Sequence, residues 1–318
     1  MKSMVYAACL LFCQSSLAET VFITLEKDNA LAVVDPIEGR LLKTIAIGQR
    51  PRGIVLSKDQ QQLYIATSDD NTIQIIDIKS LKPVGTLPSG EDPETFAISP
   101  DGDQLFVSNE DDSLVTVIDI KQNKAIKTIA VGVEPEPITV SPDGKWVASG
   151  SEATNIVHWI NKETLLVEHN TLVDPRPRGL VFTADSQQLW VTSEMGGTVT
   201  VLDVVTQSKI KSITFKIPGV LNEQIQPVGV IVTDDMQWAL VALGPANRVA
   251  LINAKTLEVE RYFLVGQRVW NLAFSTDQKH AYTTNGVSND MSIIDLEAMK
   301  VTKSIAVGRY PWGVVVKP

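Results

Sequence analysis

The segments GIVLSKDQQQLYIATSDDNTIQIID (residues 53–77) and TFAISPDGDQLFVSNEDDSLVTVID (residues 95–119) repeat one pattern 42 positions apart. Each opens with a five-residue apolar run, passes through a polar turn and a second apolar run, and closes on a run that ends in Asp. The runs are short and rich in β-branched residues, so the pattern predicts strands. A fixed period of this length is the signature of a repeat architecture.

The same register extends along the whole chain. The first-run family is GIVLS (53–57), TFAIS (95–99), PITVS (137–141), GLVFT (179–183), GVIVT (229–233), NLAFS (271–275) and GVVVK (313–317). Its members start 42, 42, 42, 50, 42 and 42 residues apart. A second family keeps this spacing: ALAVVD (30–35), TIQIID (72–77), LVTVID (114–119), IVHWIN (156–161), TVTVLD (198–203), RVALIN (248–253) and DMSIID (290–295).

Each repeat has four strand-like runs, and the fourth is the most polar. Four strands in roughly 42 residues make one blade of a β-propeller. After residue 20 the chain begins with runs that match the second, third and fourth strands, and it ends with WGVVV (312–316), which matches the first. We therefore predict an all-β, seven-bladed propeller with four antiparallel strands per blade. The C-terminal strand lies innermost and closes the ring against the three N-terminal strands, which removes exposed sheet edges at the seam.

The one irregular step adds eight residues around FKIPGVLNEQIQ (215–226). They belong either to an outer strand or to the loop after it. Surface loops tolerate such insertions, so the segment is either a neutral insertion or a loop that contacts a partner.

The N-terminus, MKSMVYAACLLFCQSSLAET, reads as a secretory signal peptide over residues 1–18, cleaved after Ala18. A lipoprotein signal fits less well, because Cys13 follows the bulky Phe12. Residues 19–318 then form a single domain without cysteine, which excludes disulfides and thiolate metal sites. Loss of Lys2 takes the formal net charge from −9 to −10. An acidic chain is a poor ligand for nucleic acid, and no second run is long enough to insert into a membrane.

The repeats LYIATSDDNTIQIID and LFVSNEDDSLVTVID resemble the YVTN-type β-propeller repeats of bacterial secreted proteins. Strings such as GQRPRGI (48–54), TSEMGGTVTVLD (192–203), LGPANRVA (243–250) and VGRYPWGVVV (307–316) resemble, more narrowly, the propeller associated with pyrroloquinoline-quinone (PQQ)-dependent catabolism. This resemblance implies a periplasmic location beside a quinoprotein dehydrogenase or a transport component, without an established reaction. Fold alone does not confer function.

The unusual residues gather in loops that a propeller places on one face, around the mouth of its central channel. Three of these loops become neighbours when the ring closes, and they form a basic, aromatic sector: Arg50, Arg52, Arg268, Trp270, Arg309, Tyr310 and Trp312. Arg176 and Arg178 lie across the ring, and an acidic sector holds Glu91, Asp92, Glu94, Glu134 and Glu136. Arginine and tryptophan favour binding surfaces, and guanidinium suits anions. The alternative is that these arginines pair with loop acids such as Asp28, Asp69 or Asp70 and only hold the turns.

Loops between second and third strands add Asn285 and Asn289 to this predicted binding face. NEDDS (109–113) has three adjacent carboxylates but lacks the spaced ligands of a calcium loop, so we interpret it as an exposed acidic turn. His158, His169 and His280 are not paired at metal-ligand spacing. We expect Trp146, Trp159, Trp190 and Trp238 to pack within blades. Without a recognised catalytic or phosphate-binding motif, no cofactor, metal or catalytic residue is predicted.

Three functions fit the sequence. The first is a periplasmic accessory protein, expected to be monomeric, that binds a partner protein or a small anionic ligand on the channel face. The second is a lactonase-like hydrolase in which Glu91, Glu110, Glu152, Asn285 and Asn289 surround a metal ion. The third is a scaffold for a secreted complex.

Overall fold

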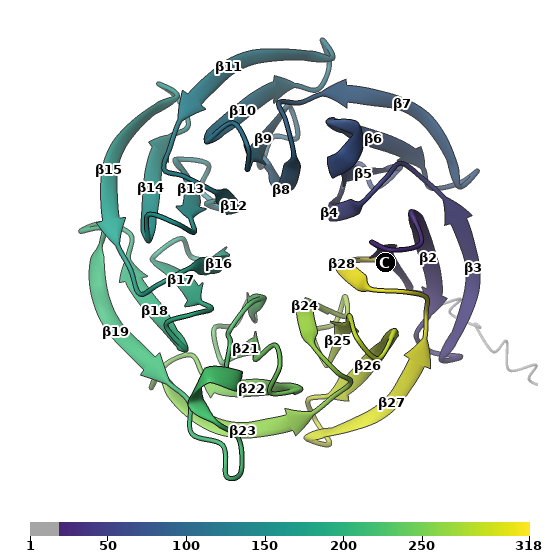
Figure 1. The fold of residues 1–318 in the computed structure, drawn as a ribbon, viewed down its shortest axis with the longest axis vertical. Coiled ribbons are helices and arrows are strands. Elements are labelled where there is room, and N and C mark those ends of the chain that lie inside the picture. Colours follow the sequence, from purple (N-terminus) through teal and green to yellow (C-terminus); the bar gives the residue numbers. More distant parts are fainter. Residues whose placement is uncertain (1–18) are drawn as a thin grey trace, which may run out of the picture.

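The computed structural model describes residues 19–318, which fold into a ring of seven four-stranded antiparallel sheets around a central axis (Figure 1). The predicted signal peptide lies outside the described residues. Blade I combines both ends of the chain: β28 (Pro311–Lys317), β1 (Thr20–Leu25), β2 (Ala30–Asp35) and β3 (Arg40–Ala46). The C-terminal strand is innermost and pairs antiparallel with β1, as Val21 opposite Val316 shows. The predicted seven blades and their closure are confirmed.

The other six blades follow in chain order from the inner to the outer strand. Blades II to IV are β4 (Pro51–Leu56), β5 (Gln62–Thr67), β6 (Thr72–Asp77), β7 (Lys82–Pro88); β8 (Pro93–Ile98), β9 (Gln104–Asn109), β10 (Leu114–Asp119), β11 (Lys124–Ala130); and β12 (Pro135–Val140), β13 (Trp146–Ser151), β14 (Ile156–Asn161), β15 (Leu166–Leu172). Blades V to VII are β16 (Pro177–Phe182), β17 (Gln188–Ser193), β18 (Thr198–Asp203), β19 (Ser208–Thr214); β20 (Val230–Val232), β21 (Trp238–Ala242), β22 (Arg248–Asn253), β23 (Glu258–Leu264); and β24 (Val269–Phe274), β25 (His280–Asn285), β26 (Asp290–Asp295), β27 (Lys300–Ala306).

The apolar core lies between blades. Seven clusters of buried side chains each join two neighbouring blades, such as Phe106 with Ile138 and Trp159 with Phe182. Trp159 and Trp190 are fully buried, and Trp159 packs edge-on against Trp146 and Phe182 at centroid distances of 6.1 and 6.0 Å. The interpretation of the strand tryptophans as blade packing is confirmed for these residues. Because each blade needs both neighbours to cover its faces, the ring is stable only as a whole.

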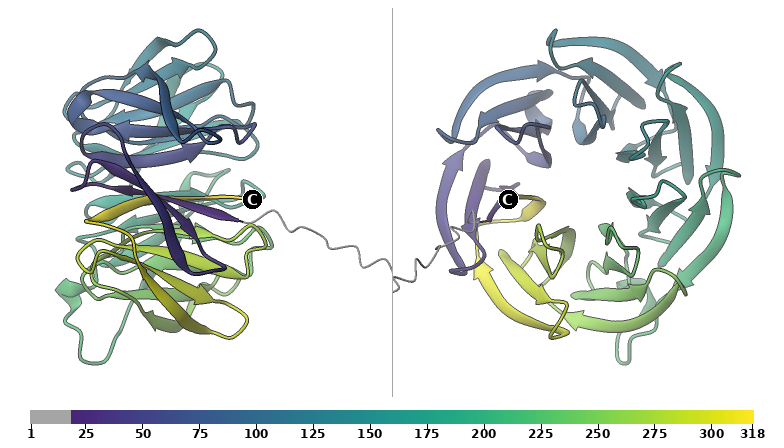
Figure 2. Two further views of the ribbon diagram at one scale, coloured as in Figure 1. Left: turned by 90° about the vertical axis from the view of Figure 1, so that its right-hand side faces the viewer. Right: turned by 180° about the vertical axis from the view of Figure 1, so that it is seen from behind.

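The two faces of the ring carry different loops. We call "loop face" the side that bears the connections from each outer strand to the next inner strand and from each second to third strand. Two 3-10 helices lie there, η1 (Ser68–Asp70) and η2 (Asn222–Gln224). The eight-residue insertion follows β19 as a loop that projects from this face (Figure 2). Within residues 19–318, no helix has the length and apolarity needed to cross a membrane.

Candidate binding face at the channel mouth

Six of the seven loops that enter the inner strands share one backbone geometry. The position compared is the last loop residue, which is followed by a proline in every blade except VII. In the successive loops it is occupied by Arg50, Asp92, Glu134, Arg176, Gln226, Arg268 and Tyr310. All except Gln226 have positive φ, between 43° and 63°. In five of them an asparagine 21 residues earlier accepts the backbone N–H, for instance Asn29 from Arg50 at 3.0 Å and Asn289 from Tyr310 at 3.1 Å. These contacts hold the loops in a conformation that most residues disfavour.

Two residues further on, a second ring of side chains lines the channel mouth. This inner ring is Arg52, Glu94, Glu136, Arg178, Val228, Trp270 and Trp312. In four blades the next residue is glycine, because the following blade approaches closely: a Cβ on Gly179 would lie 2.2 Å from the carbonyl oxygen of Val228. The inner ring is therefore charged in blades II to V and apolar or aromatic in blades VI, VII and I.

Acids pair with the arginines of blade II. Arg50 donates from Nη1 to Asp92 and from Nη2 to Glu94, both at 2.7 Å, and lies 3.9 Å from Asp69. Arg52 lies 3.3 Å from Glu94 and 3.6 Å from Glu26. The Glu94 side chain is 1% exposed. Charge-assisted bonds of this kind fix geometry strongly, so this part of the mouth is a closed ion-pair cluster.

Arg178 is the centre of a second cluster. Its guanidinium contacts Glu136 and Glu152 through hydrogen bonds and lies 3.6 Å from Glu194. Arg176 adds ion pairs to Glu152 and Glu194 at 2.9 and 3.2 Å. The Arg178 side chain is 7% exposed, and the carboxylates around it raise its pKa above the ordinary value despite its burial.

Arg268 joins this second cluster instead of the one at blade II. It donates to Glu194 at 2.9 Å and to Gln226 at 3.0 Å. The Trp270 ring lies against it, with centroid distances of 4.3 Å to Arg268 and 5.8 Å to Arg178. In the inner ring, Val228 of blade VI stands between Arg178 of blade V and Trp270 of blade VII. Because the valine side chain is short, Arg178 and Trp270 come close to each other over it. Arg178, predicted to lie across from the aromatic sector, is part of it.

The remaining predicted residues differ in exposure. Arg309 is exposed and pairs with Asp28 at 2.6 Å. Tyr310 is 40% exposed, with Lys27 over its ring at 5.9 Å, whereas Trp312 is buried beneath Arg52. Of the three arginines expected to cluster, Arg50, Arg268 and Arg309, each turns to a different acid. The alternative interpretation, pairing with loop acids, describes these contacts.

The remaining polar residues of the predicted face also differ in exposure. Glu91 and Glu134 are exposed on the loop face. Asn285 ends β25 fully buried and donates to Asp290 at 2.6 Å and Ser292 at 3.0 Å. It therefore lies inside blade VII and not on the exposed face. Both residues hold the local turn: Asn285 donates from its side-chain amide to Asp290, and Asn289 Oδ1 accepts from the backbone N–H of Tyr310.

Three buried or partly buried carboxyl groups at the mouth have raised pKa values. Burial raises the pKa of Glu94 and Glu110 to about 7, and neighbouring carboxylates add to the effect on Glu110. Burial likewise raises the pKa of Glu136 to about 8, and Glu152 contributes. The desolvated charged form is disfavoured even beside arginines. Near neutral pH these carboxyl groups therefore take up and release protons.

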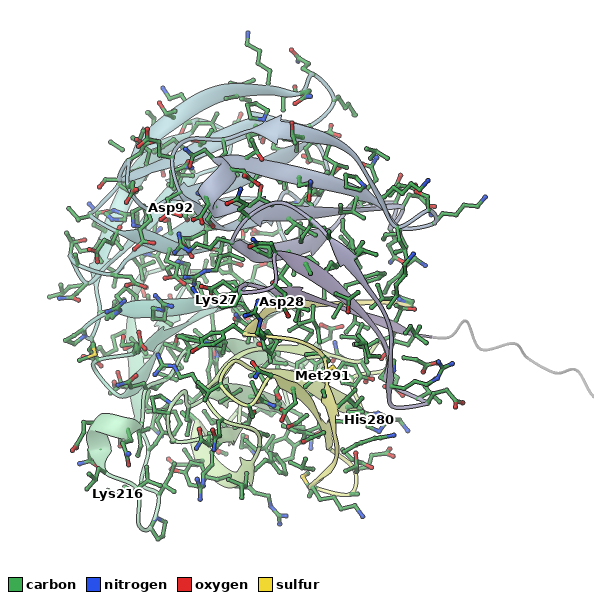
Figure 3. All side chains as sticks on the ribbon, turned by 45° about the vertical axis from the view of Figure 1, so that its right-hand side comes forward. Lys27, Asp28, Asp92, Lys216, His280 and Met291 are labelled. Carbon is green, nitrogen blue, oxygen red and sulfur yellow. The ribbon has the colours of Figure 1, made fainter. Side chains whose placement is uncertain are left out.

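Asp92, Glu94 and Glu110 bring carboxylate oxygens within 4.8 Å of one another, as three ligands of a hard cation would. Arg50 already donates to two of them, so its guanidinium supplies the positive charge at this point. The acids and asparagines proposed for a hydrolase are dispersed: Glu110 is here, Glu152 pairs with Arg178, and Asn285 is inside blade VII. Figure 3 shows Asp92 toward the loop face and His280 toward the opposite side.

Two members of the network, Glu26 and Glu194, were missed by sequence reasoning. They belong to a column at the first residue after each second strand, which reads Glu26, Ser68, Glu110, Glu152 and Glu194 at intervals of 42. The same register that defines the strands would have found them. His158 is a structural residue, as expected: its Nε2 accepts from the Gly132 N–H at 2.8 Å, and burial lowers its pKa.

The class defined by these observations is a seven-bladed β-propeller with an ion-paired channel mouth. A family model described as "Lactonase, 7-bladed beta-propeller" matches residues 29–128. The chain is similar to that family over these residues, in agreement with the predicted propeller repeat. No curated protein sequence matches the chain.

Solved structures share the fold at low sequence identity. A protein of Bacteroides uniformis provisionally assigned as a 6-phosphogluconolactonase superposes with a TM-score of 0.79 at 15% identity, covering 94% of this chain and 100% of that one. Hydrazine synthase of Kuenenia stuttgartiensis gives 0.78 at 18%, covering 87% and 92%. A protein of unknown function from Desulfotomaculum acetoxidans gives 0.78 at 14%, covering 93% and 98%. At these identities the likeness shows the fold alone.

Proposed function

We propose that this chain is an exported accessory propeller that docks a partner protein on its loop face. The observation that carries the proposal is a set of exposed apolar side chains in the loops of that face: Val133, Met195, Leu221, Val287 and Tyr310. Turns of the opposite face expose two such side chains, Ile37 and Val205, so the loop face offers the larger set of apolar loop residues for a macromolecular contact. The arginines at the mouth between them are already paired with acids.

The paired charges favour a protein partner over a small anion. Arg50, Arg178 and Arg268 would be the residues to take an anionic group. Each already donates to carboxylates at the mouth. An anion would have to displace these acids, which are largely buried, and an unpaired buried carboxylate is costly.

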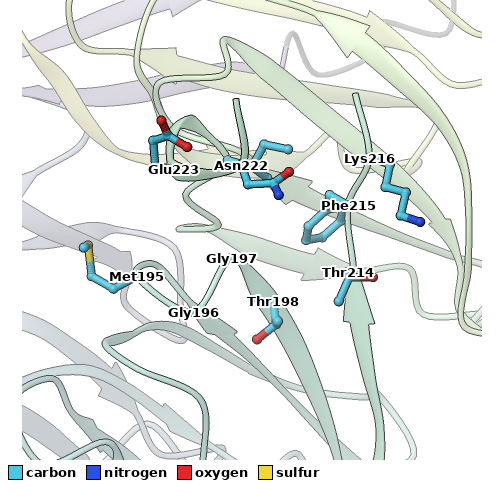
Figure 4. Close-up of a pocket in the computed structure, with 10 residues that line it drawn as sticks. Met195, Gly196, Gly197, Thr198, Thr214, Phe215, Lys216, Asn222 and Glu223 are labelled. Carbon is cyan, nitrogen blue, oxygen red and sulfur yellow. The ribbon is translucent and has the colours of Figure 1, made fainter. Parts of the chain in front are cut away.

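The insertion adds a groove to the docking face. Phe215, Ile217 and Ile225 are buried in the core between blades V and VI, so they anchor the loop. Leu221 and Met195 are left 61% and 65% exposed. Between the insertion and the loop at 195–198 lies a groove of about 590 Å³ (Figure 4). An anchored loop with an exposed apolar tip fits the interpretation that it contacts a partner.

The cellular setting is the finer part of the proposal. The signal-like residues 1–18 support export to the periplasm, and the resemblance of several strings to PQQ-associated propellers supports a quinoprotein dehydrogenase or a transport component as partner. The comparisons do not test export and give no support to the PQQ association. Processing between Ala18 and Glu19, read by N-terminal sequencing of protein recovered from periplasm, would support export.

The docking proposal is tested by capture from periplasm of alcohol-grown cells, followed by mass spectrometry. The loop-face variant M195D/L221D is compared with I37D/V205D, which places the same charges at positions 69% and 80% exposed in turns of the opposite face. We expect the wild type and I37D/V205D to retain one enriched partner, and M195D/L221D to lose it at least tenfold. Equal capture by all three proteins would contradict docking at this face.

A lactonase-like hydrolase is the second function supported by an observation. The family-model match at residues 29–128 contains all three members of the Asp92, Glu94 and Glu110 cluster. If this function holds, the purified protein contains a stoichiometric divalent ion and hydrolyses 6-phosphogluconolactone, and Glu110→Gln abolishes both. Absence of metal and of hydrolysis in correctly folded protein would leave the docking function.

A further inference from the structure

Among residues 19–318, one exposed sulfur atom lies on the docking face. This part of the chain contains no cysteine, and its sulfur is carried by Met195, Met236, Met291 and Met299. Met291 is fully buried between blades VII and I, and Met236 and Met299 are partly buried in turns of the opposite face. Met195 is 65% exposed in the loop between β17 and β18, on the loop face. Its thioether is therefore the most accessible one in residues 19–318.

The turn holds Met195 at the surface. The residue before it, Glu194, donates its backbone N–H to the Arg176 carbonyl oxygen at 2.8 Å. The residue after it, Gly196, donates its N–H to the Pro175 carbonyl oxygen at 3.0 Å. Because the backbone is fixed on both sides, the side chain stays at the edge of the groove that the insertion forms (Figure 4).

The corresponding loop position differs among the blades. From blade I to blade VII the register reads Lys27, Asp69, Asp111, Ala153, Met195, Pro245 and Val287. The position is charged in blades I to III and apolar in blades IV to VII. Met195 therefore belongs to the uncharged part of the docking face, where a new polar group changes the surface most.

The thioether of methionine is open to two-electron oxidation by hydroperoxides. The sulfur attacks the terminal peroxide oxygen, an S–O bond forms and the O–O bond breaks. The second oxygen takes up the peroxide proton and leaves as water or an alcohol, so the sulfur is oxidised and the peroxide is reduced. A strong hydrogen-bond acceptor then replaces an apolar surface, and burying it against a partner without a donor is unfavourable.

We propose that Met195 is a site of reversible oxidation by hydroperoxides, and that its sulfoxide releases the partner from the loop face. The inference rests on the docking function proposed above and adds to it a control by the oxidation state of one side chain. Reversal requires methionine sulfoxide reductases, one for each sulfoxide epimer.

The first test needs no partner. Mature protein recovered from periplasm is treated with graded hydrogen peroxide, quenched with free methionine and analysed by peptide mass spectrometry. We expect the sulfoxide to form at Met195 first, about tenfold faster than at the buried Met291, because accessibility controls the reaction. If Met236 or Met299 reacts before Met195, or if all four react alike, the proposed site is wrong.

Capture from periplasm then compares untreated protein with protein oxidised at Met195. We expect oxidation to lower partner recovery about tenfold, since a buried sulfoxide oxygen without a donor weakens the contact. Treatment with both reductases should restore recovery. Equal capture by the untreated and oxidised proteins would overturn the inference and leave docking intact. Absence of a partner on the untreated protein would contradict docking itself, and the oxidative control with it.

Two matched variants assign the loss to one sulfur atom. Each variant is compared with itself before and after peroxide, so differences in starting affinity cancel. Met195→Leu keeps an apolar side chain without sulfur, and its capture should not change on treatment. Met299→Leu removes a thioether from a turn of the opposite face, and it should lose capture as the wild type does. An equal loss in treated Met195→Leu would assign the effect to another residue and contradict the proposal.

Discussion

The two faces of the ring use the same repeat in opposite ways. On the face opposite the loops, the hairpin between first and second strands closes on itself in six blades. A Ser or Thr hydroxyl donates to an Asp two residues later, and that Asp accepts a backbone N–H, as in Ser57 with Asp59 and Ser275 with Asp277. The loop face repeats its backbone conformation but changes its side chains from blade to blade.

This difference teaches where the repeat is constrained. The closed turns repeat the same Ser/Thr–Asp–backbone contact because it is completed within each turn, and neighbouring blades add only single contacts, such as Lys162 to Asp101 and Gln278 to the N–H of Asp234. At the loop face the partners come from other blades, as when Arg268 contacts Glu194, 74 residues away. A side chain that contacts another blade can be of any charge or polarity for which that blade supplies a partner. Variation is therefore concentrated around the channel mouth, where a binding role is proposed.

The largest expected effect is loss of the Arg178 side chain. Arg178→Ala leaves Glu136, Glu152 and Glu194 without their shared partner, and breaking a buried ion-pair cluster from one side costs about 3–5 kcal/mol. The control is Lys279→Ala, which removes an exposed ion pair to Glu297 from the opposite face and should cost less than about 1 kcal/mol. Denaturant titration measures both. Similar losses in the two variants would break the comparison.

The second expected effect is on pH dependence. Burial raises the pKa of Glu94, Glu110 and Glu136 to about 7, 7 and 8, above the ordinary value near 4.5 kept by the unfolded chain. The folded state therefore binds more protons across this window, so the stability from these groups is full below pH 4.5 and is lost as pH rises through 8.

Melting temperature should accordingly fall between pH 5 and pH 8.5. Glu136→Gln removes one titrating group and should flatten the slope. Glu163→Gln changes an exposed residue in a turn of the opposite face and should leave the slope as in the wild type. A melting temperature that rises over this range would show that the mouth carboxyls are ionised in the folded state.

Strand positions, blade number and ring closure follow from the sequence because they depend on the 42-residue period alone. The structure places VFITL within β1 and seats WGVVV in β28 beside it. The insertion was correctly located near 215–226, and the structure resolves it as the loop after β19. Local periodicity fixes these features, so no long-range side-chain information is required.

The pairing at the mouth was predictable only in part. Sequence register correctly brought the arginines and indoles to one face. It did not show that Arg178 reaches Trp270, because that contact depends on the small Val228 between them and on side-chain conformation. It also missed that Asn285 turns into its blade. The ring of acids at Glu26, Glu152 and Glu194 was present in the register, and it is the signal that would have predicted paired arginines.

The smallest expected effects concern the closed turns, and they sharpen the comparison most directly. Asp59→Ala, Asp143→Ala and Asp235→Ala each remove one acceptor of a Ser or Thr hydroxyl and a backbone N–H. Each should lower the free energy of unfolding by about 1 kcal/mol. Because the three turns have the same partners, the losses should agree within about 0.5 kcal/mol, as expected of independent sites far apart.

Asn71→Ala, Asn155→Ala and Asn247→Ala remove the loop-face contacts to Asp92, Arg176 and Arg268. Their losses should differ from one another, because each releases a residue with different ion-pair partners. Uniform losses in the second set, or a wide spread in the first, would show that the two faces are constrained alike.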